Sequence, residues 1–245
     1  MSLMETLITS TTPAAPKMIV YGQPGVGKTT FAAAADAILI DCEGGAGVVP
    51  GLKRTPYLAT WPEMRAWLSE LAAAPPADLA AVAVDTLDWM LRRIEQYVNI
   101  DLDGKSPDDI TNTTGSSHGG FFKARGIIEN IVFRDLLPML NAINDGGVPI
   151  VLLAHAANLK MTTPEGFDVK MAAPDLPQWI AGPFIEWADA VLYAHMDSGQ
   201  RVLTTENTNV VTAKNRYGMP AELPFDWDTL VQSIAPPAPP TATTT

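Results

Sequence analysis

The residues with the clearest chemical purpose lie near the start of the chain, in a glycine-rich stretch that ends in Lys-Thr-Thr. The stretch fits the pattern G-x-x-x-x-G-K-[ST] and consists of Gly22, Gln23, Pro24, Gly25, Val26, Gly27, Lys28, Thr29 and Thr30. Glycines let the backbone turn tightly and point successive N–H groups at one anion. The Lys28 ammonium can neutralise phosphate oxygens, and the Thr29 hydroxyl can ligate Mg²⁺. The pattern therefore predicts a site for the β- and γ-phosphates of a nucleotide together with Mg²⁺.

The flanks of this stretch distinguish a phosphate loop from an ordinary glycine-rich turn. The apolar run 18–21 precedes it, and the alanine-rich run 31–35 follows it. This is the order of strand, turn and helix that the pattern needs before it indicates a phosphate site. A turn that merely joins two elements is the alternative, and the two matching flanks favour the phosphate loop.

Polar residues stand at the ends of four expected strands, where ligands bind in an open α/β sheet. They are Glu43, Asp85, His155 and Lys214. Asp85 follows the apolar run 79–84 and suits a Walker B carboxylate that holds Mg²⁺, although it could also cap a helix. Glu43 could be the general base for an attacking water or a solvated loop carboxylate. His155 could sense the γ-phosphate or be an ordinary hydrogen-bonded histidine.

These strand ends, together with the late segment 213–216, resemble the core of the RecA family. The resemblance covers roughly residues 17–218 and is closest to the short phage-encoded RecA-like ATPases, some of which are single-strand annealing recombinases. It implies that Glu43 is the catalytic carboxylate, Asp85 the Walker B residue and His155 the polar sensor. RecA itself has Gln at the sensor position, so His155 is a departure within the wider family.

The resemblance also implies a role for Lys214 and Arg216 at a boundary between subunits. In RecA a Lys-Asn-Lys segment reaches the γ-phosphate of the neighbouring subunit, and here Arg216 replaces the second Lys. An arginine in that place would stabilise transition-state charge in trans. A surface Lys/Arg pair near a hairpin is the alternative. If the first interpretation holds, activity requires an oligomer, either a ring or a filament.

Two segments are candidates for binding single-stranded DNA, because they mix cations with rings that can stack on bases. The first is about 102–126, and the second is about 156–182, where RecA-like proteins have a DNA loop. The candidate residues are Lys105, His118, Phe121, Phe122, Lys123, Arg125, Lys160, Lys170 and Trp179. Phe121 and Phe122 could instead be core anchors at a helix start. The tripeptide Asp175-Leu176-Pro177 resembles a pattern of the phage group but has no assigned physical role.

The elements that must position these residues follow from apolar runs and turn signals. We expect strands at 17–21, 37–42, 79–84, 149–154, 188–195, 201–204 and 210–213, and helices at 31–35, 60–74, 89–98 and 123–144. Thr60 and Glu63 form a capping-box pattern, and Pro138 should kink or split the last helix. The polar stretch 101–122 is too long for a passive connection and is interpreted as a mobile functional loop. Residues 156–182 resemble a long excursion with a hairpin turn at 164–166, and 197–199 provides another turn.

This order predicts one RecA-like α/β domain, with a mostly parallel twisted sheet flanked by helices and with antiparallel C-terminal strands. We expect it to span residues 16–234, between a flexible N-terminal arm (1–15) and a disordered Pro/Thr-rich tail (235–245). The single cysteine, Cys42, suits a reducing cytoplasm. No apolar run approaches the length of a membrane span, so no membrane partner is expected.

Two functions from different classes remain after the sequence is compared with other phosphate-loop proteins. The chain lacks the Asn-Lys-x-Asp of GTPases, the transporter signature Leu-Ser-Gly-Gly-Gln and an arginine-rich kinase lid. One function is a DNA-dependent ATPase that assembles on single strands during recombination or annealing. The other is an ATP-switched scaffold that contacts a replication, packaging or single-strand binding protein and does not itself bind DNA. The 16 basic and 27 acidic residues, a net charge of −11, favour the second, and the RecA-like strand ends favour the first.

Overall fold

The computed structural model describes residues 14–104, 117–162 and 168–234. The strands are β1 (Lys17–Gly22), β2 (Ala37–Asp41), β3 (Ala81–Asp85), β4 (Ile150–Thr162), β5 (Asp168–Pro174), β6 (Ala190–Asp197), β7 (Gln200–Thr204), β8 (Lys214–Asn215) and β9 (Glu222–Pro224). The α-helices are α1 (Lys28–Ala34), α2 (Trp61–Ala73), α3 (Leu87–Gln96), α5 (Lys123–Ile131), α6 (Leu137–Asp145), α7 (Gln178–Trp187) and α8 (Trp227–Ile234). Two π-helical segments, Tyr97–Leu102 and Val132–Leu136, extend α3 and join α5 to α6.

One sheet organises the molecule, in the strand order β2-β3-β4-β1-β6-β7-β9. The first five strands of this order pair in parallel. β7, β8 and β9 join in antiparallel fashion on the C-terminal side, and β5 pairs with the outer half of β4. The parallel strands are apolar on both faces because helices cover both faces. The predicted fold class, a mostly parallel sheet with antiparallel C-terminal strands, is therefore confirmed.

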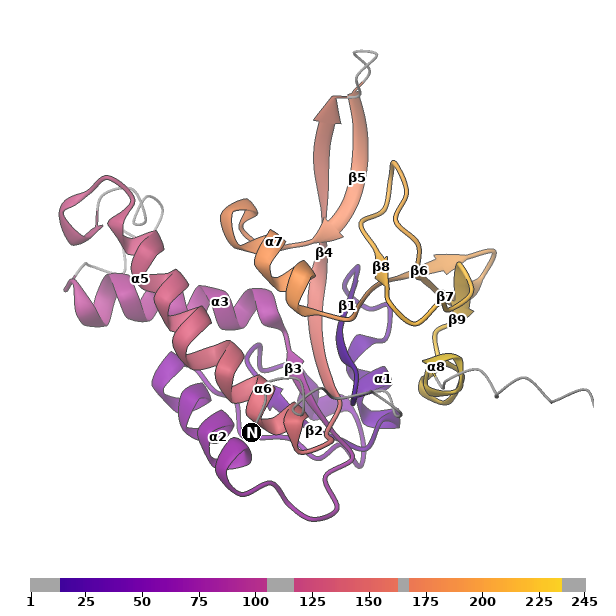
Figure 1. Ribbon diagram of the computed structural model, residues 1–245, viewed down its shortest axis with the longest axis horizontal. Coiled ribbons are helices and arrows are strands. Elements are labelled where there is room, and N and C mark those ends of the chain that lie inside the picture. Colours follow the sequence, from indigo (N-terminus) through magenta and orange to yellow (C-terminus); the bar gives the residue numbers. More distant parts are fainter. Residues whose placement is uncertain (1–13, 105–116, 163–167, 235–245) are drawn as a thin grey trace, which may run out of the picture.

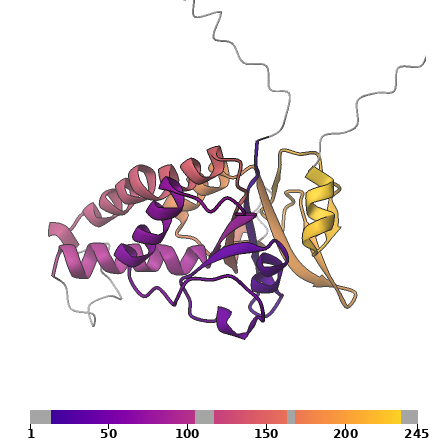
Figure 2. The same ribbon diagram turned by 90° about the horizontal axis from the view of Figure 1, so that it is seen from below.

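Helices cover the two faces of the sheet unequally, as the two views show (Figures 1 and 2). Side chains of β1 alternate between two cores: Ile19 and Tyr21 pack with residues of α2, α3, α5, α6 and α7. Met18 and Val20 pack on the other face with residues of α1 and α8. This alternation follows from the two-residue period of a strand. The result is a three-layer arrangement whose polar strand ends share one edge.

The parallel register aligns the carboxyl ends of the central strands. Gly22 of β1 pairs with His155 of β4, and Asp41 of β2 pairs with Asp85 of β3. The ladder then continues one step, because Cys42 N–H donates to the Asp85 carbonyl at 2.8 Å. The first residues after β1, β2 and β3 therefore start from neighbouring points on one edge of the sheet.

Two local predictions about helices agree with the structure. Glu63 accepts a hydrogen bond from the Thr60 N–H at 3.0 Å, as the capping-box pattern requires. In the predicted helix 123–144 the hydrogen-bond pattern is interrupted just before Pro138, because the π-helical segment Val132–Leu136 joins α5 to α6, while φ and ψ stay helical at Ile131 and Leu137. Proline has no N–H to donate, and such a change of pattern in the turn before it is one way in which a helix accommodates proline.

Three predictions about strands were wrong. β4 does not end at His155 but runs on to Thr162, and with β5 it forms an arm that projects from the sheet (Figure 1). The excursion 156–182 is therefore this hairpin followed by α7, and Asp175-Leu176-Pro177 is the short link between them. Residues 210–213 form no strand, since only the single bridge Ala172↔Val211 pairs them. β9 and α8 had no counterpart among the predicted elements.

Several predictions concern residues that the structure does not describe. Most of the arm 1–15, the tail 235–245, the turn 164–166 and much of the loop 101–122 lie outside the described residues. No helix within the described ranges is long and apolar enough to cross a membrane.

Candidate functional site

The phosphate loop has the backbone geometry that its glycines predict. Gly25 and Gly27 adopt φ values of 80° and 107°, in the left-handed region that side-chain-bearing residues rarely enter. Gly27 immediately precedes α1, so Lys28, Thr29 and Thr30 form the first turn of that helix. The buried Lys28 ammonium donates to the carbonyls of Gly22 at 3.0 Å and Gln23 at 3.3 Å. The cation is thereby held over the loop whose N–H groups would surround a phosphate.

Thr29 and Asp85 meet across the edge of the sheet. The Thr29 hydroxyl donates to Asp85 Oδ2 at 2.8 Å, and Asp85 is only 6% exposed. Burial raises the pKa of the Asp85 carboxyl to about 6, with the Thr29 hydrogen bond opposing the rise. Two adjacent oxygens suit Mg²⁺, which proteins commonly hold through one or two such ligands plus substrate phosphates. Within the described ranges no group of three or more His, Cys, Asp or Glu side chains could hold a metal alone, so phosphate oxygens would complete the ligand set.

Glu43 is placed by a turn that Asp41 organises. The Gly44 N–H donates to Asp41 Oδ1 at 2.6 Å, and the Asp41 N–H donates to the Thr55 hydroxyl at 3.1 Å. Asp41 is buried, so the turn has a fixed base. The Glu43 carboxylate extends from this turn to the cleft at the phosphate loop, with a side chain that is 37% exposed. It is accessible to water and faces the place where a phosphate would lie.

His155 is held by Asp88, a residue that the sequence interpretation did not select. One oxygen of Asp88 accepts the His155 backbone N–H at 3.0 Å, and the other contacts His155 Nδ1 at 2.9 Å. The opposite ring nitrogen, Nε2, lies 3.8 Å from Glu43 Oε2. The hydrogen bond to Asp88 raises the pKa of His155. Burial favours the neutral form of Asp88, but the hydrogen bonds from His155 outweigh it and lower the pKa of that carboxyl.

One cleft of about 330 Å³ beside the phosphate loop is lined by Lys28, Thr29, Glu43, Asp85 and His155. Arg201 of β7 also lines it, and the Arg201 side chain lies across Gly27: a Cβ added to that glycine would stand 3.7 Å from the guanidinium carbon. The cleft therefore combines the cationic side chains of Lys28 and Arg201, and the imidazole of His155, with two carboxylates. This combination of charges suits a polyanion accompanied by a divalent cation.

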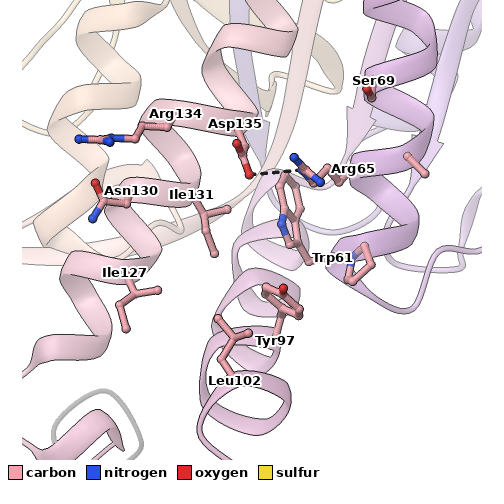
Figure 3. A pocket seen from close by; sticks show the side chains of 12 residues that line it. Trp61, Arg65, Ser69, Tyr97, Leu102, Ile127, Asn130, Ile131, Arg134 and Asp135 are labelled. Atoms are coloured by element: carbon pink, nitrogen blue, oxygen red, sulfur yellow. Dashed lines mark ion pairs between the residues drawn. The ribbon is translucent and has the colours of Figure 1, made fainter.

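A larger hollow, of about 640 Å³, lies away from the phosphate loop. Figure 3 shows it between α2 on one side and α5 with the π-helical segment Val132–Leu136 on the other, with Trp61 and Tyr97 facing Ile127 and Ile131. The charged pair drawn there, Arg65 and Asp135, is 3.3 Å apart and satisfies itself. The hollow contains no arrangement of groups for phosphate chemistry.

Lys214 and Arg216 are not in the cleft of their own chain. The Lys214 ammonium donates to the carbonyls of Ile185, Glu186 and Ala188 at 2.7, 2.8 and 2.6 Å, at the C-terminal end of α7. All three of its donors are used in this capping role. The Arg216 guanidinium is 55% exposed and forms an ion pair with Asp189 at 2.9 Å. Of these two residues, Arg216 is the one that is exposed on the surface.

The candidate DNA-binding residues fall into two neighbouring groups, apart from Lys105, which lies outside the described residues. Phe121 is 92% exposed and Phe122 is 52% exposed, so neither is a core anchor. Lys123 follows them at the start of α5, and the Arg125 guanidinium lies 4.1 Å from the Phe122 ring and 5.8 Å from the Trp179 ring of α7. His118 instead contacts the Val98 carbonyl at 2.8 Å. The second group, Lys160 and Lys170, is exposed on the β4–β5 hairpin.

Asp88 and Arg201 are the two site residues that sequence reasoning missed. Asp88 stands three residues after Asp85, in the first turn of α3, and that spacing is a signal that could have found it. Arg201 had no comparable signal, because it reaches the cleft only through the β6–β7 hairpin.

The Asp88–His155 contact can be tested by substituting the carboxylate with an amide. In Asp88→Asn the pKa of His155 should fall, because a neutral acceptor no longer stabilises the imidazolium. NMR titration of the imidazole signals would measure this, and His118 and His195 serve as internal controls because neither contacts Asp88. An unchanged His155 titration would contradict the contact.

A family described as an AAA domain, AAA_24, matches residues 14–217. No curated protein matches the chain. A solved RadB recombinase is similar to it with a TM-score of 0.43 and 16% sequence identity, covering 78% of this chain and 81% of that one. The family match extends from before β1 to beyond β8 and includes every residue of the cleft. The chain therefore belongs to the AAA domain family AAA_24.

Proposed function

We propose that this chain binds ATP with Mg²⁺ in the cleft at the phosphate loop and hydrolyses it. The observation that carries the proposal is the convergence of Lys28, the Thr29–Asp85 pair, Glu43 and His155 on one cleft. Each group matches one requirement of phosphoryl transfer: charge neutralisation, metal ligation, activation of water and contact with the γ-phosphate. The membership of the AAA domain family agrees with this chemistry.

Each residue of the cleft would have its own role in ATP binding or hydrolysis. The phosphate loop and Lys28 bind and orient the triphosphate, and Thr29 and Asp85 supply oxygens for Mg²⁺, which would neutralise charge on the phosphates. Glu43 accepts a proton from the attacking water, because it is the carboxylate in the cleft with the greatest access to solvent. His155, held by Asp88, donates from Nε2 towards the γ-phosphate. Arg201 adds a positive charge beside the loop.

We propose further that the protein acts on single-stranded DNA in recombination or annealing. Lys160 and Lys170 support this, because they are direct partners in the β4–β5 register and both are exposed. Like charges directly opposite each other in an antiparallel pair destabilise it, so an anion between them is favourable. Asp168 lies in the same strand, so the hairpin is not uniformly basic and the lysine pair is a local feature.

The second candidate group lies close to this hairpin. Figure 1 shows α7 between the β4–β5 hairpin and α5, and the Arg125–Trp179 contact joins α5 to α7. Exposed rings beside cations are the usual means of binding unpaired bases. Phe121, Phe122 and Arg125 would stack on bases, while the lysine pair would contact the phosphate backbone.

Catalysis by Glu43 predicts a separation of binding from turnover. Glu43→Gln should retain ATP affinity within about threefold and lower the hydrolysis rate by about 10²–10⁴-fold, the usual contribution of a general base. Calorimetry and a phosphate-release assay would measure the two quantities. Lys28→Ala should lose binding as well, and the exposed Glu222→Gln should change neither. Turnover at the wild-type rate in Glu43→Gln would remove this residue from the mechanism.

The lysine pair predicts salt-dependent binding of single strands. The double variant Lys160→Gln/Lys170→Gln should weaken binding and reduce the slope of log K against log salt by about 1.4, or about 0.7 for each lost phosphate contact. Lys53→Gln/Arg65→Gln removes the same charge elsewhere and should leave the slope unchanged. If single-stranded DNA neither binds the wild type in a salt-sensitive way nor stimulates ATP hydrolysis, the scaffold function, which the net charge of −11 favours, replaces this one.

We also propose that Arg216 acts on the nucleotide of a neighbouring subunit in a ring or filament. Arg216→Ala should then reduce turnover at concentrations where the protein assembles but leave the ATP affinity of the isolated subunit intact. Arg65→Ala is a matched control, because Arg65 is 57% exposed and is also paired with an aspartate. Equal turnover of wild type and Arg216→Ala in the assembled state would refute the proposal.

A further inference from the structure

A second, smaller hollow adjoins the phosphate cleft on the side of α1 and α8. It measures about 160 Å³ and shares Gly27, Thr30 and Arg201 with the lining of the cleft. Because three residues border both spaces, a ligand held at the phosphate loop can extend from one into the other. Thr30 lies at the first turn of α1, immediately after the Thr29 that would ligate Mg²⁺.

The lining of this hollow differs in chemistry from the cleft. Phe31, Ala34, Phe225 and Trp227 supply apolar and aromatic surface. The rings of Phe31 and Phe225 stack with centroids 4.7 Å apart, and Trp227 meets Phe31 edge-on at 5.5 Å. These contacts fix the aromatic wall, while Phe225 and Trp227 stay partly exposed. Such a surface suits a flat ring system and not a further phosphate.

The wall is anchored to the same strand that carries Arg201. The Phe225 N–H donates to the Arg201 carbonyl at 3.0 Å. Asp226 accepts from the N–H groups of Asp228 at 3.1 Å and Thr229 at 3.0 Å, and so fixes the start of α8. Because Arg201 borders both the hollow and the cleft, its guanidinium can either stack on a ring in the hollow or contact a phosphate in the cleft. The planar shape of the group suits both roles.

From these observations we infer that the hollow formed by Ala34, Arg201 and the segment 225–227 binds the purine base of the nucleotide. The inference rests on the proposed function, since the phosphates must occupy the adjoining cleft. A volume of about 160 Å³ is far below the roughly 300–1,000 Å³ of a pocket that encloses a whole ligand. It therefore fits one ring system of a molecule bound mainly elsewhere.

Filling the hollow from an exposed position tests the inference without disturbing the core. Ala34 is exposed on α1, and leucine is a good helix former, so Ala34→Leu should fold. We would measure the affinities of Mg-ATP and of Mg-tripolyphosphate, which lacks the base, by calorimetry. The wild type should bind ATP about tenfold more tightly or better, as expected for one stacked base. Ala34→Leu should remove most of this difference and leave tripolyphosphate affinity within about twofold.

Matched controls separate failure of this inference from failure of the proposed function. Ala66→Leu places the same side chain on an exposed position of α2 and should change neither affinity. Binding of ATP should also change the tryptophan fluorescence of the wild type, and this change should be lost in Trp227→Phe. Equal affinities of the wild type for the two ligands, or equal weakening of both by Ala34→Leu, would overturn the base subsite alone. If neither ligand binds the wild type, the phosphate site and the subsite both fail.

Discussion

The arrangement of the site depends on the hydrogen bond between Thr29 and Asp85. It joins the first turn of α1 to the end of β3 at 2.8 Å, although β1 and β3 are not neighbours in the sheet. β4 lies between them, so the bond forms only if all three strands end at the same level. The parallel register aligns the ends of these strands, since Gly22 lies opposite His155. A shift of either strand would separate the two oxygens and remove the geometry that a magnesium–phosphate complex requires.

The same convergence gives the carboxylates of the site different properties. Burial raises the pKa of Asp85 to about 6, while the contact with His155 lowers the pKa of Asp88. The environments thus push two acids that are three residues apart in opposite directions, which is how a protein assigns separate roles to similar groups. A nearby cation would stabilise the ionised form of Asp85 more than that of Asp88, because the buried Asp85 carboxylate is poorly solvated. Asp88 already has its partner and serves to orient His155.

The sequence predicted the parts of the site that depend on local rules. The phosphate loop needs only a strand, glycines and a helix, and Glu43 and Asp85 follow buried strands directly. The residues it missed depend on pairings between distant segments. Arg201 is placed by the β6–β7 hairpin, and the segment 225–227 is placed by pairing with β7. The outer half of β4 was also missed, although residues 157–162 alternate between apolar and polar side chains. Interpreting His155 as the end of a strand placed a break before this alternation, whereas pairing with β5 makes β4 continuous.

The continuation of β4 beyond the sheet links the two halves of the proposed function. Lys160 stands five residues beyond His155 in the same uninterrupted strand. The base of the hairpin is fixed to β1, because the Tyr21 hydroxyl contacts the carbonyls of Ala172 at 3.0 Å and Thr212 at 2.7 Å. Tyr21 itself directly precedes Gly22 of the phosphate loop. The proposed γ-phosphate contact and the lysine pair therefore lie on one continuous strand. The acidic charge of the whole chain weighs against DNA binding, and the lysine pair is the local basic feature that would have to overcome it.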